Sequence, residues 1–143
     1  MLDQMKALAA EKTICVLATA AGNRPHCSLM AYVTDKYCRE IFMVTHRSSR
    51  KYHNLTRNPA VSLLIDTREE LERTQAQALT VEGVFEKIQD EDKRASVRSR
   101  LLAVHPHLQA FIDHPDGELL CIKVKSFLLL TGLNEAHFEV LPM

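Results

Sequence analysis

The sequence predicts an α+β fold that is mainly β, with six antiparallel strands and a few peripheral helices. Six segments rich in β-prone or alternating residues are separated by turn signals. Ala21-Gly22-Asn23, between the first two of them, has the composition of a hairpin turn, and shorter segments show the apolar spacing of helices. At 143 residues the chain is predicted to be one domain, residues 1–143, with its own core.

The predicted elements follow in order along the chain. Leu2, Met5, Leu8 and Ala9 have the spacing of a short amphipathic helix. Strands are predicted at residues 13–19, 26–34, 39–45, 60–66, 74–88 and 118–131, the last as one strand or two. Gly83 lies within the fifth of these segments and predicts a bulge or bend there.

Two helices are predicted between the strands. Ser48 or Ser49 is a suitable N-cap for a short helix, because a serine hydroxyl can accept from the free N–H groups of the first turn. That helix ends just before Pro59, since the residue preceding a proline is held out of helical geometry. A longer helix at residues 90–104 begins with acidic residues, which suit its dipole, and a short helical turn follows at 108–112.

The junction between the third strand and the short helix has the features of an anion site. Thr45 and Ser49 supply hydroxyls, and Arg50 and Lys51 place two cations in the first helical turn, where the dipole disfavours them. Free N–H groups at a helix start already attract anions, and Arg and Lys are the residues that bind phosphate oxygens. The junction therefore predicts a pocket for the phosphate of a larger flat ligand, with a solvated basic helix as the alternative.

Several motifs in order give the chain a resemblance to a known family. Leu17-Ala18-Thr19 followed by Gly22-Asn23-Arg24-Pro25-His26 resembles the first hairpin of the pyridoxamine 5′-phosphate oxidase-like, FMN-binding split-barrel proteins. Thr45 followed by Ser49-Arg50-Lys51 and Asn54-Leu55 resembles their phosphate-binding segment. Asn58-Pro59-Ala60-Val61-Ser62-Leu63 is similar to the strand that follows in that family. The resemblance covers residues 13–66 and continues more weakly to about residue 88.

This resemblance implies a six-stranded antiparallel split β-barrel with peripheral helices and with FMN as its cofactor. It also implies a homodimer with two flavins bound at the subunit interface. The residues implied to contact FMN are His26, Cys27, Ser28 and Leu29 along the ring, Val44 and Thr45 at the ring or ribityl chain, Ser49, Arg50 and Lys51 at the phosphate, and Gln77 or Gln75 at the flavin of the partner subunit.

Three classes of function follow from this reading. The first is an FMN-dependent oxidoreductase that passes hydride or electrons to an unidentified small substrate, a reaction that FMN carries without a protein acid or base. The second is an FMN-binding or electron-transfer module without a dedicated substrate. The third is a split barrel that binds another planar ligand such as haem, or nothing. Retention of Arg50, Lys51 and the preceding hydroxyls argues against the third class.

Oxidation of a vitamin B6 phosphate is not the first expectation. Pyridoxamine phosphate oxidases have a longer chain with a basic and aromatic C-terminal segment, whereas this sequence has no Trp and ends in Phe138-Glu139-Val140-Leu141-Pro142-Met143. The sequence therefore resembles a short, generic member of the family, and its catalytic residues are not identified.

Composition excludes several other functions. The 18 Lys and Arg residues balance the 18 Asp and Glu residues, so the net charge gives no reason to expect nucleic acid as a partner. No apolar run is long enough for a membrane span, and residues 1–11 are too polar for a cleavable signal, so a cytoplasmic protein is expected. The histidines match no zinc pattern, and no metal site is predicted. Cys15 and Cys27 lie within predicted strands and are expected in the core.

Overall fold

The structure is a computed structural model that describes residues 1–143 except residues 73 and 143. Its described strands form one antiparallel sheet in the order β2-β1-β5-β6-β7-β4-β3. The eighth strand, β8, pairs with residues 126–131 of β7, whereas β4 pairs with residues 117–123 of the same strand. The strands are β1 (Ile14–Ala21), β2 (Arg24–Ala31), β3 (Val33–Thr34), β4 (Glu40–His46), β5 (Ala60–Asp66), β6 (Gln77–Lys87), β7 (Gly117–Thr131) and β8 (Glu135–Val140).

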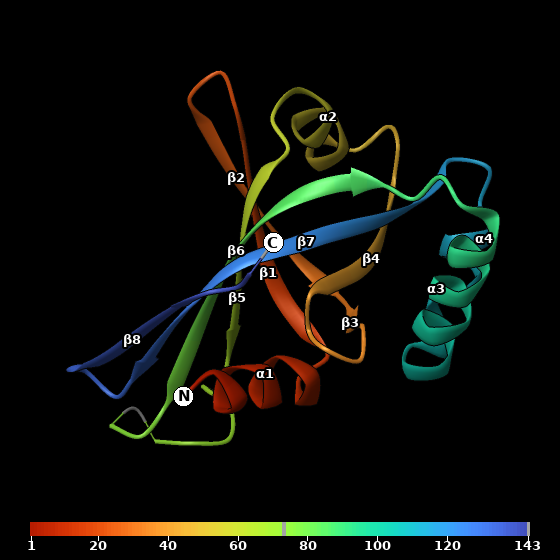
Figure 1. The fold of residues 1–143 in the computed structure, drawn as a ribbon. Helices are drawn as coiled ribbons and strands as arrows, with labels where there is room; N and C mark the ends of the chain where they lie inside the picture. Colours follow the sequence, from red (N-terminus) through yellow and green to blue (C-terminus); the bar gives the residue numbers. More distant parts are fainter. Residues whose placement is uncertain (73, 143) are drawn as a thin grey trace.

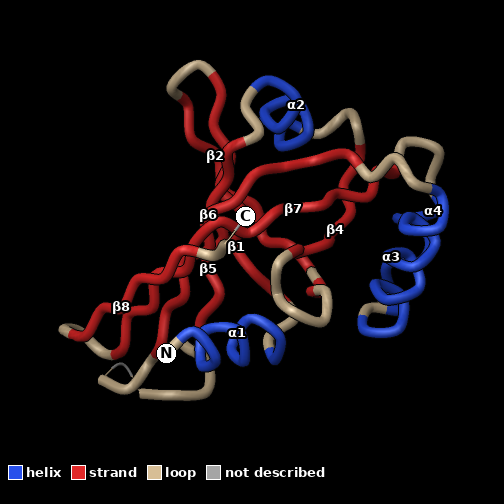
Figure 2. Tube along the Cα trace, in the orientation of Figure 1, coloured by secondary structure: helices blue, strands red, loops and turns tan. Residues whose placement is uncertain are grey.

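The sheet curls into a half-closed barrel, and the helices lie around its outside (Figures 1 and 2). The helices are α1 (Leu2–Glu11), α2 (Arg50–Arg57), α3 (Glu91–Val104) and α4 (Gln109–Asp113), with a 3-10 turn, η1 (Pro106–Leu108), before α4. None of the helices in the described part of the chain is both long and apolar enough to cross a membrane. The mainly-β α+β architecture predicted from the sequence is confirmed.

The strand count differs from the six that were predicted. The predicted strand at 26–34 is two strands, because Tyr32 interrupts the ladder: its N–H donates to the Thr13 carbonyl at 2.9 Å, and its hydroxyl donates to the Ala9 carbonyl at 2.6 Å. After Tyr32 the chain leaves β1 and pairs with β4 as β3. The segment at 118–131 is one strand, β7, which is long enough to pair with β6, β4 and β8.

Strand β8 was missed because its side chains give little burial signal. Most of its residues are exposed, and the strand exists through its register with β7. Gly132, at a φ of 63°, makes the connecting turn, and Leu141 after the strand is buried, with its N–H donating to the Lys125 carbonyl at 2.8 Å. The Gly132-Leu133-Asn134 turn was the available sequence signal.

Two glycine positions were read correctly. Gly22 and Asn23 both have positive φ, at 56° and 63°, and form the hairpin turn that was predicted at Ala21-Gly22-Asn23. Gly83 marks a bulge, because the register between β6 and β7 shifts between Glu82 and Gly83. A Cβ on Gly83 would lie 2.5 Å from the Lys123 carbonyl oxygen, so the two strands approach too closely there for any side chain.

The sheet has two hydrophobic clusters and one open face. The larger cluster fills the barrel and includes residues from α1, α2 and the inner faces of the strands. The smaller cluster lies between β4, β7 and α3. On the outward face of β2, β1, β5, β6, β7 and β8, one side chain from each strand forms a cross-strand row that is not buried: Leu29, Val16, Leu64, Thr80, Leu128 and Phe138.

A charged cluster holds α3 against the sheet. The Glu40 carboxylate accepts from Lys93 of α3 at 2.8 Å and from the buried Cys121 thiol at 3.1 Å, and Lys123 lies 3.4 Å away. Burial works to raise the pKa of Glu40, but these hydrogen bonds and charges outweigh it and hold the pKa below its ordinary value. Burial, followed by the hydrogen bond to Glu40 and the charge of Glu40, raises the pKa of Cys121 to about 12. The thiol therefore stays protonated and can donate.

This cluster predicts a loss of stability in acid. Since the folded-state pKa of Glu40 is lowered, its contribution is complete above the unfolded value, about 4.3, and is lost as the pH falls through the folded value. Urea unfolding at pH 7, 5, 4 and 3 should show that Glu40→Gln flattens the acid side of the stability curve. Glu135→Gln, at an exposed position on β8, is the control. Equal acid slopes for both variants would rule out this role of Glu40.

Candidate functional site

The start of α2 is built from side chains of β4 and the helix itself. Ser49 is the N-cap: its Oγ accepts from the Tyr52 N–H at 3.3 Å, and its backbone is extended, at φ −76° and ψ 156°. The Thr45 hydroxyl, buried at the end of β4, lies 3.0 Å from the same Ser49 oxygen. Of the two serines considered for the cap, Ser49 is therefore the one used, and the helix begins at Arg50 with its first N–H groups outside the intrahelical ladder.

The helix is anchored to the sheet on the side of β1. The Asn54 side-chain amide donates to the buried Thr19 hydroxyl of β1 at 3.1 Å. Tyr52 and Leu55 are buried, as their spacing predicted, and the Tyr52 ring meets Phe85 edge-on with ring centres 6.3 Å apart. Because Thr19 is paired with His26 of β2, this contact brings α2 close to the β1–β2 hairpin.

The loop before α2 is held by the turn that precedes β7. Arg47 donates to the Pro115 carbonyl at 2.6 Å and pairs with Glu118 at 3.1 Å. Ser48 donates to the Asp116 carboxylate from its hydroxyl at 2.7 Å and from its N–H at 3.1 Å, and these bonds lower the pKa of Asp116. Arg47 and Ser48 therefore fix the loop, and Arg47 is already neutralised by its partners.

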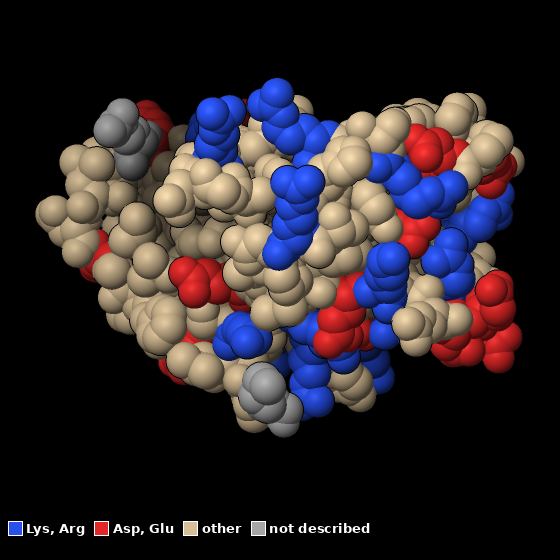
Figure 3. All heavy atoms as spheres, turned by 90° about the horizontal axis from the view of Figure 1, so that it is seen from above, with Lys and Arg blue, Asp and Glu red and all other residues tan. Residues whose placement is uncertain are grey.

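Arg50 and Lys51 differ from Arg47 in this respect. Among the described residues, no Asp or Glu oxygen lies within 4.0 Å of either cationic group. Arg50 is exposed and Lys51 is half-buried. Figure 3 shows the face of the molecule that carries α2, where several Lys and Arg side chains project from the middle of the surface. Two cations that have no acidic partner within the described chain, beside the free N–H groups of a helix start, can attract a dianion.

The four residues predicted along β2 do not share one face. His26 and Ser28 are half-buried and point to the inner side of the sheet, whereas Cys27 and Leu29 are exposed on the outer side. Cys15 is buried, but the expectation that Cys27 belongs to the core is wrong. A ligand lying on one side of β2 can therefore meet the side chains of only two of these four residues.

Val44 and Thr45, which are neighbours on β4, also face opposite ways. The Val44 side chain is buried in the smaller hydrophobic cluster under α3, whereas Thr45 points to Ser49. Beyond them, the His46 ring is stacked between Phe111, 3.9 Å away, and His114, 4.6 Å away. Its Nε2 atom is buried without a hydrogen-bond partner among the described residues. The backbone of Val44 is thus the only part of that residue that can face a ligand beside Thr45.

Gln77 lies far from α2 in the same chain. It opens β6 at the end where Asp66 closes β5, and its N–H donates to the Thr67 hydroxyl at 2.8 Å. The seven residues of β5 run from beside α2 to that end, a distance of roughly 20 Å at about 3.3 Å per residue. Gln75 is exposed in the loop before β6, at the same end of the sheet. Neither glutamine can reach a small ligand on Arg50 of its own chain.

The start of α2 brings together groups that could bind an anion, and little that resembles acid–base machinery. The Thr45 and Ser49 hydroxyls lie together where the first turn of α2, with Arg50 and Lys51, begins, and Asn54 and Thr19 hold the helix in place. No group of three His, Cys, Asp or Glu side chains suited to a metal was found in the part of the chain that the structure describes. Thr19, Ser48 and Asp116 were not assigned from the sequence, because their partners lie 35 and 68 residues away.

Comparison with known proteins places this fold in a family. Residues 1–130 match the family model described as pyridoxamine 5′-phosphate oxidase. The chain therefore belongs to the pyridoxamine 5′-phosphate oxidase-like split β-barrel family. None of the curated proteins matches the sequence.

Solved structures with the same fold are only distantly related in sequence. A haem-binding protein from Mycobacterium smegmatis is 18% identical with a TM-score of 0.84, and the match covers 96% of this chain and 56% of that protein. The haem storage protein of Vibrio cholerae is 19% identical with a TM-score of 0.75, covering 90% of this chain and 92% of that one. An FAD-binding protein from Mesorhizobium loti is 14% identical with a TM-score of 0.75, covering 90% and 93%. This chain thus spans a little over half of the mycobacterial protein, and these likenesses describe the fold.

Proposed function

We propose that this chain is an FMN-binding flavoprotein and that it serves as an oxidoreductase acting on a small substrate. The single observation that carries the proposal is the start of α2, where Arg50 and Lys51 have no acidic partner in the part of the chain that the structure describes and the helix is capped by Ser49. A doubly charged phosphate matches that charge and the free N–H groups. Membership of the pyridoxamine 5′-phosphate oxidase-like family supports FMN as the molecule that carries the phosphate.

The protein's own residues have binding and positioning roles in this proposal. Arg50 and Lys51 hold the phosphate, and the Thr45 and Ser49 hydroxyls supply polar partners beside it. His26 and Ser28, half-buried on the inner side of β2, lie on the strand that opposes Thr19 and so border the same region. When bound, FMN supplies hydride or electron transfer, which needs no acid or base from the chain. An electron-transfer module without its own substrate would use the same site.

A homodimer with flavin at the interface is part of the proposal. The outward row from Leu29 to Phe138 leaves apolar side chains unburied on five of its six strands, with Leu29 exposed by 75% and Phe138 by 59%. Such a face suits association with a second copy. Gln77 cannot reach α2 of its own chain, but a two-fold axis running across the strands would bring the Gln77 end of one copy to the α2 end of the other. That geometry would give each flavin residues from both subunits.

Haem is the second candidate, and one finding favours it. The two haem-associated structures described above match this fold with TM-scores of 0.84 and 0.75. Haem carries carboxylates instead of a phosphate monoester, and its iron needs an axial ligand such as His or Cys. The half-buried His26 and the exposed Cys27 on β2 are available side chains of those types.

Ligand titration separates these functions. We expect the purified protein to bind FMN with a flavin absorption spectrum, and to bind riboflavin, which lacks the phosphate, at least tenfold more weakly, since a charge-assisted hydrogen bond contributes about 1.5–3 kcal/mol. A protein that ignores FMN and gives a Soret band with haem would refute flavin binding. If bound FMN is reduced by neither NADH nor NADPH, the electron-transfer module becomes the better description.

A further inference from the structure

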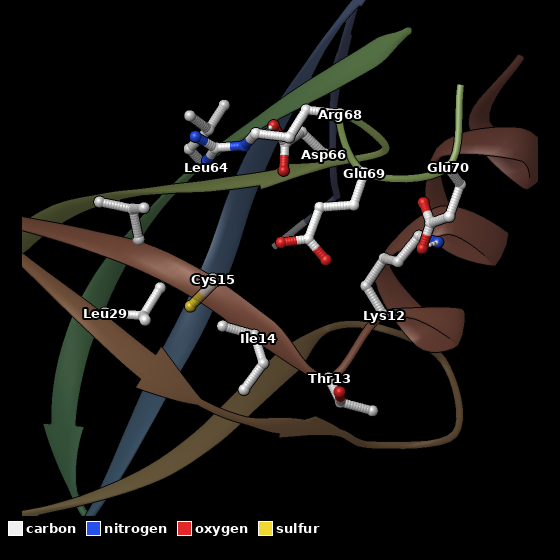
Figure 4. Close-up of a pocket in the computed structure, with 11 residues that line it drawn as sticks. Lys12, Thr13, Ile14, Cys15, Leu29, Leu64, Asp66, Arg68, Glu69 and Glu70 are labelled. Carbon is white, nitrogen blue, oxygen red and sulfur yellow. Dashed lines mark ion pairs between the residues drawn. The ribbon is translucent and has the colours of Figure 1, made fainter. Parts of the chain in front are cut away.

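A cavity of about 570 Å³ lies on the outward face of the sheet, beside the start of β1 (Figure 4). Leu29 and Leu64 line it together with Val16, and these three side chains belong to the outward row proposed to meet a second copy. A partner subunit seated on that row would cover the cavity. This cavity is therefore part of the proposed dimer and offers no separate ligand site.

A smaller cavity, of about 300 Å³, lies under α3. Helices α3 and α4, the end of β4 and the start of β7 border it, and its described lining shares no residue with the outward row. Figure 1 shows α3 and α4 at one side of the sheet and β8 at the opposite side. The volume is at the lower end of the range of about 300–1,000 Å³ that holds small organic ligands, so a ligand of few atoms is expected.

The floor of this smaller cavity is aliphatic. Val44 of β4 and Leu119 of β7 are opposite one another in the cross-strand register, and Ile112 of α4 lines the cavity with them. All three pack in the smaller hydrophobic cluster under α3. The cavity is lined by the Val44 side chain, whereas only the Val44 backbone can face the proposed flavin, so the two sites use different parts of this residue. An apolar group in the cavity would extend the cluster and leave water.

Two arginines of α3 line the same cavity, and their partners differ. Arg94 and Arg98 lie one helical turn apart, and both are half-buried. Arg98 donates to the Asp113 carboxylate from Nε at 3.2 Å and from Nη2 at 2.6 Å. Arg94 donates from Nη1 to the Ile88 carbonyl at 3.1 Å, and no Asp or Glu oxygen of the described chain lies within 4.0 Å of it. Arg94 is thus held by a neutral partner and keeps its charge uncompensated.

One carboxylate also borders the cavity, that of Glu91 in the first turn of α3. Glu91 is exposed, and no Lys, Arg or His nitrogen of the described residues lies within 4.0 Å of its carboxylate. It therefore forms no ion pair with Arg94, and water and salt screen an exposed charge more than a half-buried one. Since Asp113 compensates Arg98, the half-buried charge left beside the apolar floor is the positive charge of Arg94.

We infer that this cavity, which we call the Arg94 pocket, binds a small carboxylate with an apolar body. The carboxylate pairs with the Arg94 guanidinium, whose planar fork matches two carboxylate oxygens. The apolar body covers Val44, Ile112 and Leu119. An ammonium ion of the same size would be repelled by Arg94, and an uncharged ligand would leave Arg94 unpaired, so charge complementarity selects the anion. This inference does not rest on flavin binding.

The test uses benzoate and its cationic counterpart benzylammonium, with amide-proton NMR on the full-length protein. Benzoate should shift the signals of residues 44, 94–98, 112 and 117–119, and benzylammonium should leave them unchanged. Arg94→Gln should weaken benzoate binding about fivefold, at the upper end for a partly exposed ion pair. Glu91→Gln should strengthen it about twofold by removing a like charge. Arg57→Gln on α2 is the charge-matched control and should leave the affinity unchanged.

Opposite effects of the two α3 variants could not come from a general loss of folding. The inference is overturned if benzoate does not bind, as would also happen if a partner subunit covered the cavity. It is likewise overturned if benzylammonium binds equally well or if Arg94→Gln leaves the benzoate affinity unchanged. Benzoate bound only at the start of α2 would instead shift residues 49–52 and compete with FMN, and this result would also refute the Arg94 pocket. FMN titration of the same samples reports separately on the site at α2.

Discussion

Replacing Arg50 and Lys51 together by alanine is expected to raise the dissociation constant of FMN about a hundredfold. Each of the two substitutions removes a charge-assisted contact with the phosphate, and each such contact contributes about 1.5–3 kcal/mol to binding. Both side chains lie at the solvent-facing helix start, so the lower figure applies, and roughly 3 kcal/mol in total corresponds to about two decades of affinity. Fluorescence titration of the apoprotein with FMN measures the effect directly.

A matched control is available on the same helix. Arg57 is exposed in the last turn of α2, one helix length from Ser49, and Arg57→Ala removes a similar charge without touching the proposed phosphate site. It should change FMN affinity less than about twofold, because screening weakens distant exposed charges. Neither variant should alter thermal unfolding much, since the side chains lie outside the core. Equal affinities for wild type and the double variant would contradict the assignment of Arg50 and Lys51.

Truncating Phe127 to alanine is expected to give the largest loss of stability. Phe127 is fully buried in the larger hydrophobic cluster, on β7, the strand that pairs with β4, β6 and β8. Its loss removes transfer free energy and leaves a cavity, which together cost about 3–5 kcal/mol for a buried aromatic residue. Urea unfolding monitored by circular dichroism should show a lower midpoint with a similar slope.

The control for this variant is Tyr37→Ala. Tyr37 is exposed by 59% in the turn between β3 and β4, so its removal should change the free energy of unfolding by no more than about 0.5 kcal/mol. If Phe127→Ala were as mild as this control, β7 would not occupy the centre of the core.

Features set by local physics were predictable from the sequence. The short helix ends at the proline as expected, and Ser49, one of the two candidates, caps it. The strand before it and the strand after it were placed within one residue of their observed bounds. These features depend on capping, on the restricted residue before Pro59 and on alternating burial, all of which involve neighbours in the chain.

Features set by partners far along the chain were not predictable. The anchoring of Arg47 and Ser48 depends on residues 115–118, and the anchoring of Asn54 depends on Thr19, so neither could be read from the stretch at 45–66. The division of residues 26–34 into β2 and β3 follows from Tyr32, whose hydroxyl reaches Ala9. For the same reason, the sequence could not show that Arg47 has acidic partners whereas Arg50 has none among the described residues.

The most direct test of the central claim is a crystal structure of this protein with FMN. The account predicts that the phosphate lies at the start of α2, with its oxygens within hydrogen-bond distance of the Arg50 guanidinium and the Lys51 ammonium group. It also predicts that Gln77 near each flavin comes from the other subunit. A phosphate bound at any other place, or those two cations directed into solvent beside a bound flavin, would contradict it.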